Sequence, residues 1–154
     1  MRRFAVFVCS FGYVGFFPIA PGTAGSAAGL VLYVLLRRLG AVNFELPLAI
    51  GLFALGVWLG AAAEQALGST DPGPVVLDEV MGMILTLAFI PVNWVGMLLG
   101  FVIFRALDVW KPYPAGRLEH LPGGLGMMSD DAMAAVYANV LMQTAYYFSP
   151  ALVS

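Results

Sequence analysis

Four long stretches of the sequence contain no charged side chain, and they limit what the chain can fold into. They are Phe4–Leu36, Leu46–Ala63, Val80–Phe104 and Ala132–Ser154. A helix needs about 20 apolar residues to cross the hydrocarbon core of a bilayer. Hydrophobic residues make up 61% of the chain and charged residues only 10%, far from the balance of a soluble domain. We therefore predict a single all-α domain over residues 1–154, a polytopic integral membrane protein.

The first stretch is too long for one span and is divided by prolines. Phe4–Leu36 contains Pro18 and the turn Pro21-Gly22-Thr23. Proline followed by glycine is typical of a turn, and threonine is a good N-cap. We predict an N-terminal interfacial or re-entrant segment, followed by a helix from Thr23 to about Leu39 with Thr23 as its N-cap.

The third stretch carries a turn signal at its centre. Pro91-Val92-Asn93 interrupts Val80–Phe104, and proline breaks or kinks a helix. We predict a hairpin of two short helices, Leu77–Ile90 and Trp94–Val109. With helices over Leu46–Ala63 and from Ala132 to about Tyr147, about four to five short transmembrane helices are expected.

The hairpin decides which charges lie on the same side of the membrane. Asp78 and Glu79 share a side with Asp108 only if the chain between them crosses twice. Basic residues favour the cytoplasm, and those expected there are Arg2, Arg3, Arg105, Lys111 and Arg117. This topology leaves Arg37 and Arg38 outside. The alternative, in which Phe4–Leu36 dips into the membrane and Val80–Phe104 crosses once, brings them inside but moves Asp78 and Glu79 outside. We prefer the hairpin because it explains Pro91 and the acidic residues together.

Composition excludes several kinds of chemistry. The net charge is −2, with seven Lys and Arg residues, so we expect no nucleic-acid partner. Cys9 is the only cysteine and His120 the only histidine. A disulfide within the chain, a thiolate metal site and a phosphohistidine mechanism that needs two histidines are therefore excluded.

The charged residues gather in two windows of this charge-poor chain. Nine of the sixteen charged residues are Asp78, Glu79, Arg105, Asp108, Lys111, Arg117, Glu119, Asp130 and Asp131. Charges near a bilayer are costly and usually serve a site or pair with each other. Carboxylate oxygens suit Mg²⁺, and a guanidinium three residues from a carboxylate suits a phosphate beside a metal. The structural alternatives are helix capping by Asp78 and Glu79 and an Arg105–Asp108 salt bridge along one helix face.

Two glycine-containing segments accompany these charges. Gly123-Gly-Leu-Gly-Met-Met-Ser-Asp-Asp131 leads into the last helix, and its glycines would let the backbone approach a ligand; a flexible linker with Ser129 or Asp130 as N-cap is the alternative. Pro21-Gly-Thr-Ala-Gly-Ser26 could offer hydroxyls and free N–H groups to an anion, although a tight turn with close helix packing explains it better by itself. Gly82 is expected to clear space beside Asp78 and Glu79.

Taken together, these segments resemble the phosphatidylglycerophosphatase A family. The matching pieces are Pro21–Ser26, Asp78-Glu-Val-Met-Gly82, Phe104-Arg-Ala-Leu-Asp-Val-Trp-Lys-Pro-Tyr-Pro114 and Gly123–Asp131, in the family's order over most of the chain. The resemblance departs at Ala135, where the family often has glycine, and at Met127, where it often has isoleucine. It implies an inner-membrane phosphatase that uses Mg²⁺ to convert phosphatidylglycerol phosphate to phosphatidylglycerol and phosphate, with its active site facing the cytoplasm.

On this reading we assign roles to individual residues. The expected metal ligands are Asp78, Glu79, Asp108, Asp130 and Asp131, around one or two Mg²⁺ ions. The expected catalytic residues are Asp78, Asp108, Asp131 and Lys111. The expected substrate-binding residues are Arg105, Lys111, Thr23, Ser26 and Gly124. A water activated by the metal is preferred as nucleophile, and an acyl-phosphate on an aspartate stays open.

Two other kinds of function remain as alternatives. A small ion or solute transporter could use the same acidic cluster, although we find no internal repeat and the charges lie at helix ends. A non-catalytic scaffold leaves the clustered charges unexplained. The expected partners are a phospholipid substrate and the lipid bilayer, and a homo-oligomer stays open.

Overall fold

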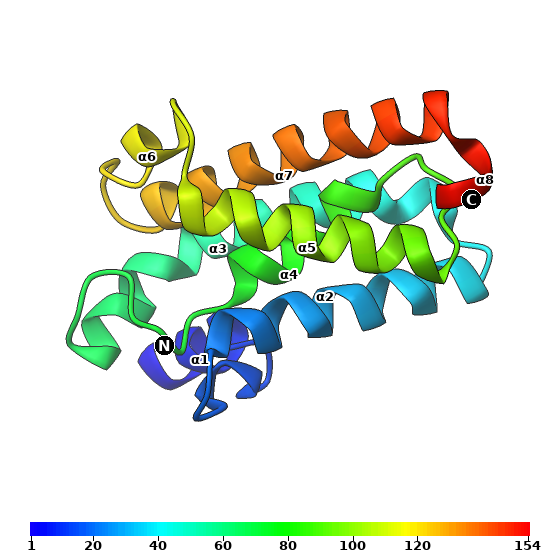
Figure 1. Ribbon diagram of the computed structural model, residues 1–154. Helices are drawn as coiled ribbons and strands as arrows, with labels where there is room; N and C mark the ends of the chain where they lie inside the picture. The colour runs from blue at the N-terminus through cyan, green and yellow to red at the C-terminus, as the bar shows by residue number, and fades with distance from the viewer.

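The protein is entirely helical in the described residues, as predicted (Figure 1). The computed structural model describes the backbone of residues 1–154 and every side chain except that of Leu152. The helices are α1 Arg2–Cys9, α2 Pro21–Arg38, α3 Glu45–Leu67, α4 Leu77–Leu87, α5 Trp94–Trp110, α6 Ala115–Leu118, α7 Gly124–Phe148 and α8 Pro150–Val153, with 3₁₀ turns η1 Val14–Phe16 and η2 Val42–Phe44.

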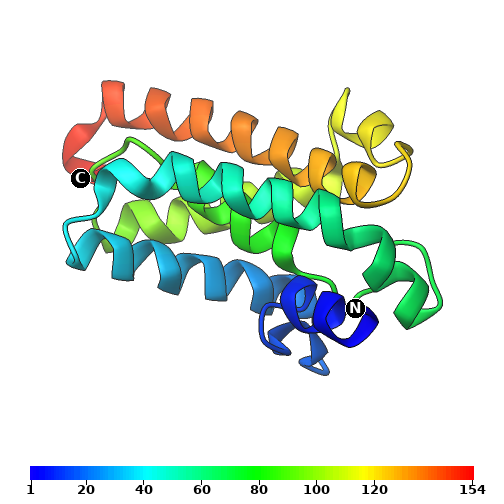
Figure 2. The ribbon, with the colours of Figure 1, turned by 180° about the vertical axis from the view of Figure 1, so that it is seen from behind.

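Four long helices form a bundle around the short α4. Helices α2, α3, α5 and α7 lie side by side in both views (Figures 1 and 2), and α4 packs against all four of them. One end of the bundle, here the proximal end, holds the loops 10–20, 68–76 and 111–123. The other, the distal end, holds 39–44, 88–93 and the C-terminus (Figure 2). The helices α4 and α7 therefore start where α5 ends.

The predicted hairpin of two short helices over residues 77–109 is confirmed. Helix α4 ends at Leu87, and α5 begins at Trp94. The Asn93 side chain caps α5 by accepting the backbone N–H of Gly96 at 2.9 Å. Helix α4 is three residues shorter than predicted because Ala88 takes an extended conformation and Phe89 a positive φ. The single-span alternative for this segment is wrong.

Helix α4 ends inside the bundle, where its last carbonyl groups need partners. Asn139 of α7 supplies them: its Nδ2 donates to the carbonyl oxygens of Leu85, Thr86 and Ala88 at 3.0–3.1 Å. Unpaired carbonyl groups in an apolar interior are costly. Asn139 thus allows a helix to stop in the middle of a bundle.

Arg37 and Glu45 fix the turn that follows α4. Arg37 Nε lies 2.6 Å from Glu45 Oε1, and the Glu45 side chain is completely buried. Glu45 accepts the Phe89 N–H, while Arg37 and the Tyr33 hydroxyl both donate to the Ile90 carbonyl. Arg37 is therefore paired with a buried carboxylate at the distal end.

Two predicted helix starts are wrong. Helix α2 starts at Pro21, not Thr23, and its N-cap is Ala20 without a side-chain hydrogen bond; proline at the first helical position explains the shift. Helix α7 starts at Gly124, not near Ala132, so the glycine-rich segment forms its N-cap and first two turns, and neither Ser129 nor Asp130 is an N-cap. A Cβ on Gly124 would lie 2.5 Å from the Gly56 carbonyl oxygen. Gly124 therefore allows α7 to pack closely on α3.

The first twenty residues lie across the proximal end. Helix α1 has 8 residues, about 12 Å at 1.5 Å per residue, too short to cross a bilayer. It packs on α3, and the Val76 N–H donates to the Cys9 carbonyl at 2.9 Å. Gly15 lies so close to the Pro74 carbonyl that a Cβ would overlap it.

Large apolar side chains cover the outside of the bundle. Examples are Val31 and Leu35 on α2, Ile50 and Trp58 on α3, Leu98 and Val102 on α5, and Val136 and Val140 on α7. By length and composition, Val42–Leu67 is the single described helical stretch able to cross a membrane. The prediction of four to five spans is therefore not confirmed by this criterion.

Candidate functional site

Three carboxylates from two helices meet at the proximal end. Asp78 and Glu79 lie in the first turn of α4, and Asp131 lies in the second turn of α7. Each offers one oxygen, and these three oxygens all lie within 4.8 Å of one another. Asp78 and Asp131 are only 7% and 4% exposed. We call these three residues the acidic triad; the hairpin and the start of α7 bring them together.

The triad has the electrostatics of a cation site. Glu79 Oε2 and Asp131 Oδ2 are buried without a hydrogen-bond partner. A buried carboxylate oxygen without a partner is costly, and several like charges this close together add repulsion. A divalent cation relieves both costs, and hard carboxylate oxygens suit Mg²⁺. The residues present therefore fit the metal that the sequence led us to expect.

Arg105 and Asp108 border the triad. Arg105 Nη1 forms an ion pair with Asp108 Oδ2 and lies 3.8 Å from Glu79 Oε1. Asp108 also interacts with Asp131. The salt bridge that sequence analysis offered as the structural alternative is thus present, but it lies within the acidic cluster and not on the helix surface. The Arg105 guanidinium thus lies beside the carboxylates of Asp108 and Glu79, where an anion bound to a metal could reach it.

Lys111 is held by two acids at the end of α5. Its Nζ lies 2.5 Å from Glu119 Oε2 and 2.7 Å from Asp130 Oδ2. Burial acts to lower the pKa of Lys111, but its hydrogen bonds to Asp130 and Glu119 raise that pKa well above the usual value. The hydrogen bond to Lys111 lowers the pKa of Glu119. Lys111 is therefore a permanent cation, and Asp130 is its partner, outside the triad.

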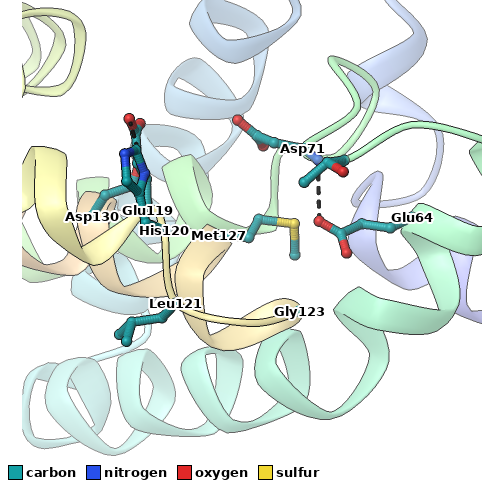
Figure 3. A pocket seen from close by; sticks show the side chains of 9 residues that line it. Glu64, Asp71, Glu119, His120, Leu121, Gly123, Met127 and Asp130 are labelled. Atoms are coloured by element: carbon teal, nitrogen blue, oxygen red, sulfur yellow. Dashed lines mark hydrogen bonds and ion pairs between the residues drawn. The ribbon is translucent and has the colours of Figure 1, made fainter.

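A polar pocket of about 210 Å³ opens beside Asp130 (Figure 3). Its charged and polar lining is Glu64, Thr70, Asp71, Glu119, His120 and Asp130. The Asp71 N–H donates to Glu64 Oε1 at 3.1 Å. Sequence analysis missed Glu64 and Asp71; the turn Asp71-Pro72-Gly73 was the only signal for them. The pocket therefore reaches both acids that hold Lys111.

The Pro21–Ser26 segment approaches the cluster through one residue. A Cβ on Gly22 would lie 2.3 Å from Glu79 Oε1 and 3.2 Å from both terminal nitrogens of Arg105. Ser26 is buried and its hydroxyl donates to the Gly22 carbonyl at 3.0 Å, whereas Thr23 is exposed. The start of α2 therefore borders the site through the backbone of Gly22.

Two glycines have other neighbours than expected. A Cβ on Gly82 would lie 2.4 Å from Phe104 Cζ, so this glycine makes room for α5 and not for a ligand beside Asp78. Gly124 contacts the α3 backbone. His120 lies in an exposed loop.

Sequence comparisons find relatives of this chain among phosphatases. The sequence model of the family described as phosphatidylglycerophosphatase A matches residues 7–146. Phosphatidylglycerophosphatase A of Escherichia coli (strain K12) is 40% identical over 124 residues, 79% of this chain and 72% of the relative. The protein of the same name from Haemophilus influenzae is 38% identical over 131 residues, covering 84% and 80%. A relative from Bacteroides thetaiotaomicron, provisionally named phosphatidylinositol-3-phosphatase, is 34% identical over 138 residues, covering 85% and 86%. No solved structure matches.

Proposed function

Because the chain belongs to the phosphatidylglycerophosphatase A family and is therefore a phosphoric monoester hydrolase, we propose that it uses Mg²⁺ to hydrolyse phosphatidylglycerol phosphate to phosphatidylglycerol and phosphate. One observation supports the proposal of a metal ion. The triad Asp78, Glu79 and Asp131 has three carboxylate oxygens that lie within 4.8 Å of one another. Two of these residues have a buried oxygen without a partner.

Different side chains would have different roles in hydrolysis. Asp78, Glu79 and Asp131 would hold the ion, with Asp108 beside them. When bound, Mg²⁺ would polarise the phosphate and lower the pKa of a water. Arg105 would bind the phosphate oxygens beside the ion. Lys111, always charged, would stabilise negative charge as it develops on the oxygen that leaves phosphorus.

Phosphate release from defined lipids tests the substrate. Purified protein in mixed micelles should hydrolyse phosphatidylglycerol phosphate much faster than phosphatidylinositol 3-phosphate at equal surface concentration. The reverse preference would contradict the proposed substrate and would favour the activity for which the Bacteroides relative is named. The transporter alternative is not favoured, since the family is one of phosphatases.

We propose that the bundle spans the membrane several times, with the proximal end in the cytoplasm. The apolar side chains on the outside of α2, α3, α5 and α7 support this. At 1.5 Å per residue these helices are roughly 25–38 Å long, close to the thickness of a bilayer core. The proximal end carries Arg2, Arg3, Lys111 and Arg117, as expected for a cytoplasmic face.

Cysteine labelling checks this topology. Arg38 and Arg117 are both exposed, at the distal and proximal ends respectively. In spheroplasts of a bacterial host, a membrane-impermeant maleimide should label the Arg38→Cys variant and should label Arg117→Cys only after lysis. The native Cys9 is fully buried, so its background should be low. Equal labelling of both variants before lysis would contradict the topology.

Glu119 competes with the substrate for Lys111. Its carboxylate lies 2.5 Å from Lys111 Nζ, where a phosphate oxygen would bind. We expect Glu119→Gln to lower KM about two- to fivefold, the range of an exposed ion pair, with kcat little changed. Glu64→Gln is the control, because it removes the same charge from the same pocket without touching Lys111. A higher KM in Glu119→Gln would instead make Glu119 part of the substrate site.

A further inference from the structure

An apolar groove runs between α5 and α7 on the outside of the bundle. It has a volume of about 320 Å³, and its walls include Leu107, Trp110 and Tyr113 on one side and Tyr137, Val140 and Leu141 on the other. Trp110 and Tyr113 are about three-quarters exposed. We propose that this groove holds an acyl chain of the phospholipid substrate; this inference rests on the proposed function.

The groove and the active site share one turn of helix. Leu107 and Trp110 flank Asp108 in the last turn of α5, and Lys111 follows directly. Asp108 is oriented by Arg105 next to the triad, while Leu107 and Trp110 line the groove. A molecule with a phosphate at one end and a hydrocarbon chain at the other could therefore contact both through the same turn.

The rim of the groove has the chemistry of a lipid headgroup region. The Tyr137 hydroxyl donates to the Tyr113 carbonyl at 2.9 Å, which ties the segment after α5 to α7. The Arg117 guanidinium lies 5.3 Å from the centre of the Tyr113 ring. Aromatic rings of this kind favour the membrane interface, and Arg117 complements the phosphodiester that links the glycerol of the headgroup to the diacylglycerol.

Toward the distal end, the α7 wall of the groove is aliphatic. Val140 and Leu141 lie about one helical turn beyond Tyr137, toward the distal end. Both are apolar and about half exposed. From the proximal end, the order is thus cation, aromatic rim and aliphatic wall. A phospholipid has the matching order of phosphate, glycerol and acyl chain.

A lipid chain fits this groove better than a second protein copy does. A stable protein interface buries about 1,200–2,000 Å², whereas the groove is a single open concavity of about 320 Å³ between two helices. Since bilayer hydrocarbon is already apolar, seating a chain here gains little affinity. Its effect is to orient the headgroup, and misplacement of a substrate by about 1 Å can cost as much as a 100-fold loss in rate.

Filling the groove tests the proposal. Val140→Trp should lower kcat/KM for dioleoyl phosphatidylglycerol phosphate about tenfold or more, by displacing the chain and with it the headgroup. The same variant should change kcat/KM for the deacylated substrate less than about twofold, because that compound has no chain to displace. Val31→Trp on α2 is the matched control, since Val31 is 60% exposed and Val140 57%, and it should leave both substrates unaffected. Leu141→Trp should behave as Val140→Trp does.

Each outcome separates this inference from the function it rests on. If the wild-type protein releases phosphate but both groove variants match Val31→Trp, or lose both substrates equally, the groove does not hold the chain. If the wild-type protein releases phosphate from neither substrate, the proposed function itself fails. If the tryptophan variants do not fold, phosphatidylglycerol with a photoreactive chain decides in the wild-type protein. Labelling concentrated at 137–144 supports the groove, and labelling spread evenly over the helices overturns it.

Discussion

Asp131→Asn is expected to reduce phosphate release more than about 100-fold while the protein still folds. Even the outer partners of metal ligands cost 10- to 100-fold when removed, and Asp131 belongs to the triad itself. The amide keeps the shape of the side chain but removes a buried charge that has an unpartnered oxygen. Without metal, the variant should be as stable as the wild-type protein or more so, since repulsion among the carboxylates falls.

Thermal unfolding with and without Mg²⁺ separates a metal ligand from a structural residue. Mg²⁺ should raise the Tm of the wild-type protein, because a ligand that binds the folded state stabilises it. The Asp131→Asn variant should lose most of that shift. Glu64→Gln, an acid-to-amide change at the same end of the bundle, should keep it. Wild-type turnover and a full Mg²⁺ shift in Asp131→Asn would remove Asp131 from the site.

Arg37→Leu is expected to destabilise the protein by about 3–5 kcal/mol, the cost of leaving a buried charge without its partner. Glu45 is fully buried and 2.6 Å from Arg37, so the variant leaves its carboxylate with the Phe89 N–H alone. The loss should appear as a lower midpoint in chemical or thermal unfolding. It should also reduce activity at temperatures where the wild-type protein is stable.

The double variant Arg37→Leu/Glu45→Leu distinguishes lost pairing from lost packing. Removing both charges of a buried pair is often neutral or stabilising, so the double variant should recover most of the stability lost in Arg37→Leu. If it is less stable than Arg37→Leu, the two residues contribute mainly through shape and through their bonds to Phe89 and Ile90. In that case the charge pair is not what fixes the turn after α4.

The hairpin and the convergence of the acids could be predicted because the chain is so poor in charge. In such a chain, Pro91 and two groups of carboxylates are strong signals: proline sets where the helix breaks, and the cost of charge near a bilayer sets which residues must meet. Asp78, Glu79, Asp108 and Asp131 followed from this reasoning, and the structure brings them together. Positive charge was a weaker guide, since Arg37 is neutralised by a partner on another helix.

The contacts that sequence reasoning missed are those set by residues far apart in the chain. The early end of α4 depends on Asn139, more than fifty residues away. The roles of the glycines were predicted wrongly for another reason. Both a flexible loop and a close contact between helices favour a residue without a Cβ. The sequence alone therefore could not show that Gly124 packs on α3 or that Gly82 faces Phe104. Asp130 looked equivalent to Asp131, but their side chains point to different partners because they are adjacent on a helix.

The central claim is that the triad holds a divalent metal that the hydrolysis of phosphatidylglycerol phosphate requires. The most direct measurement is phosphate release from that lipid by the purified protein as a function of free Mg²⁺. Our account predicts release that saturates with Mg²⁺, stops when EDTA removes the metal and returns when Mg²⁺ is restored. Undiminished release in excess EDTA would contradict it.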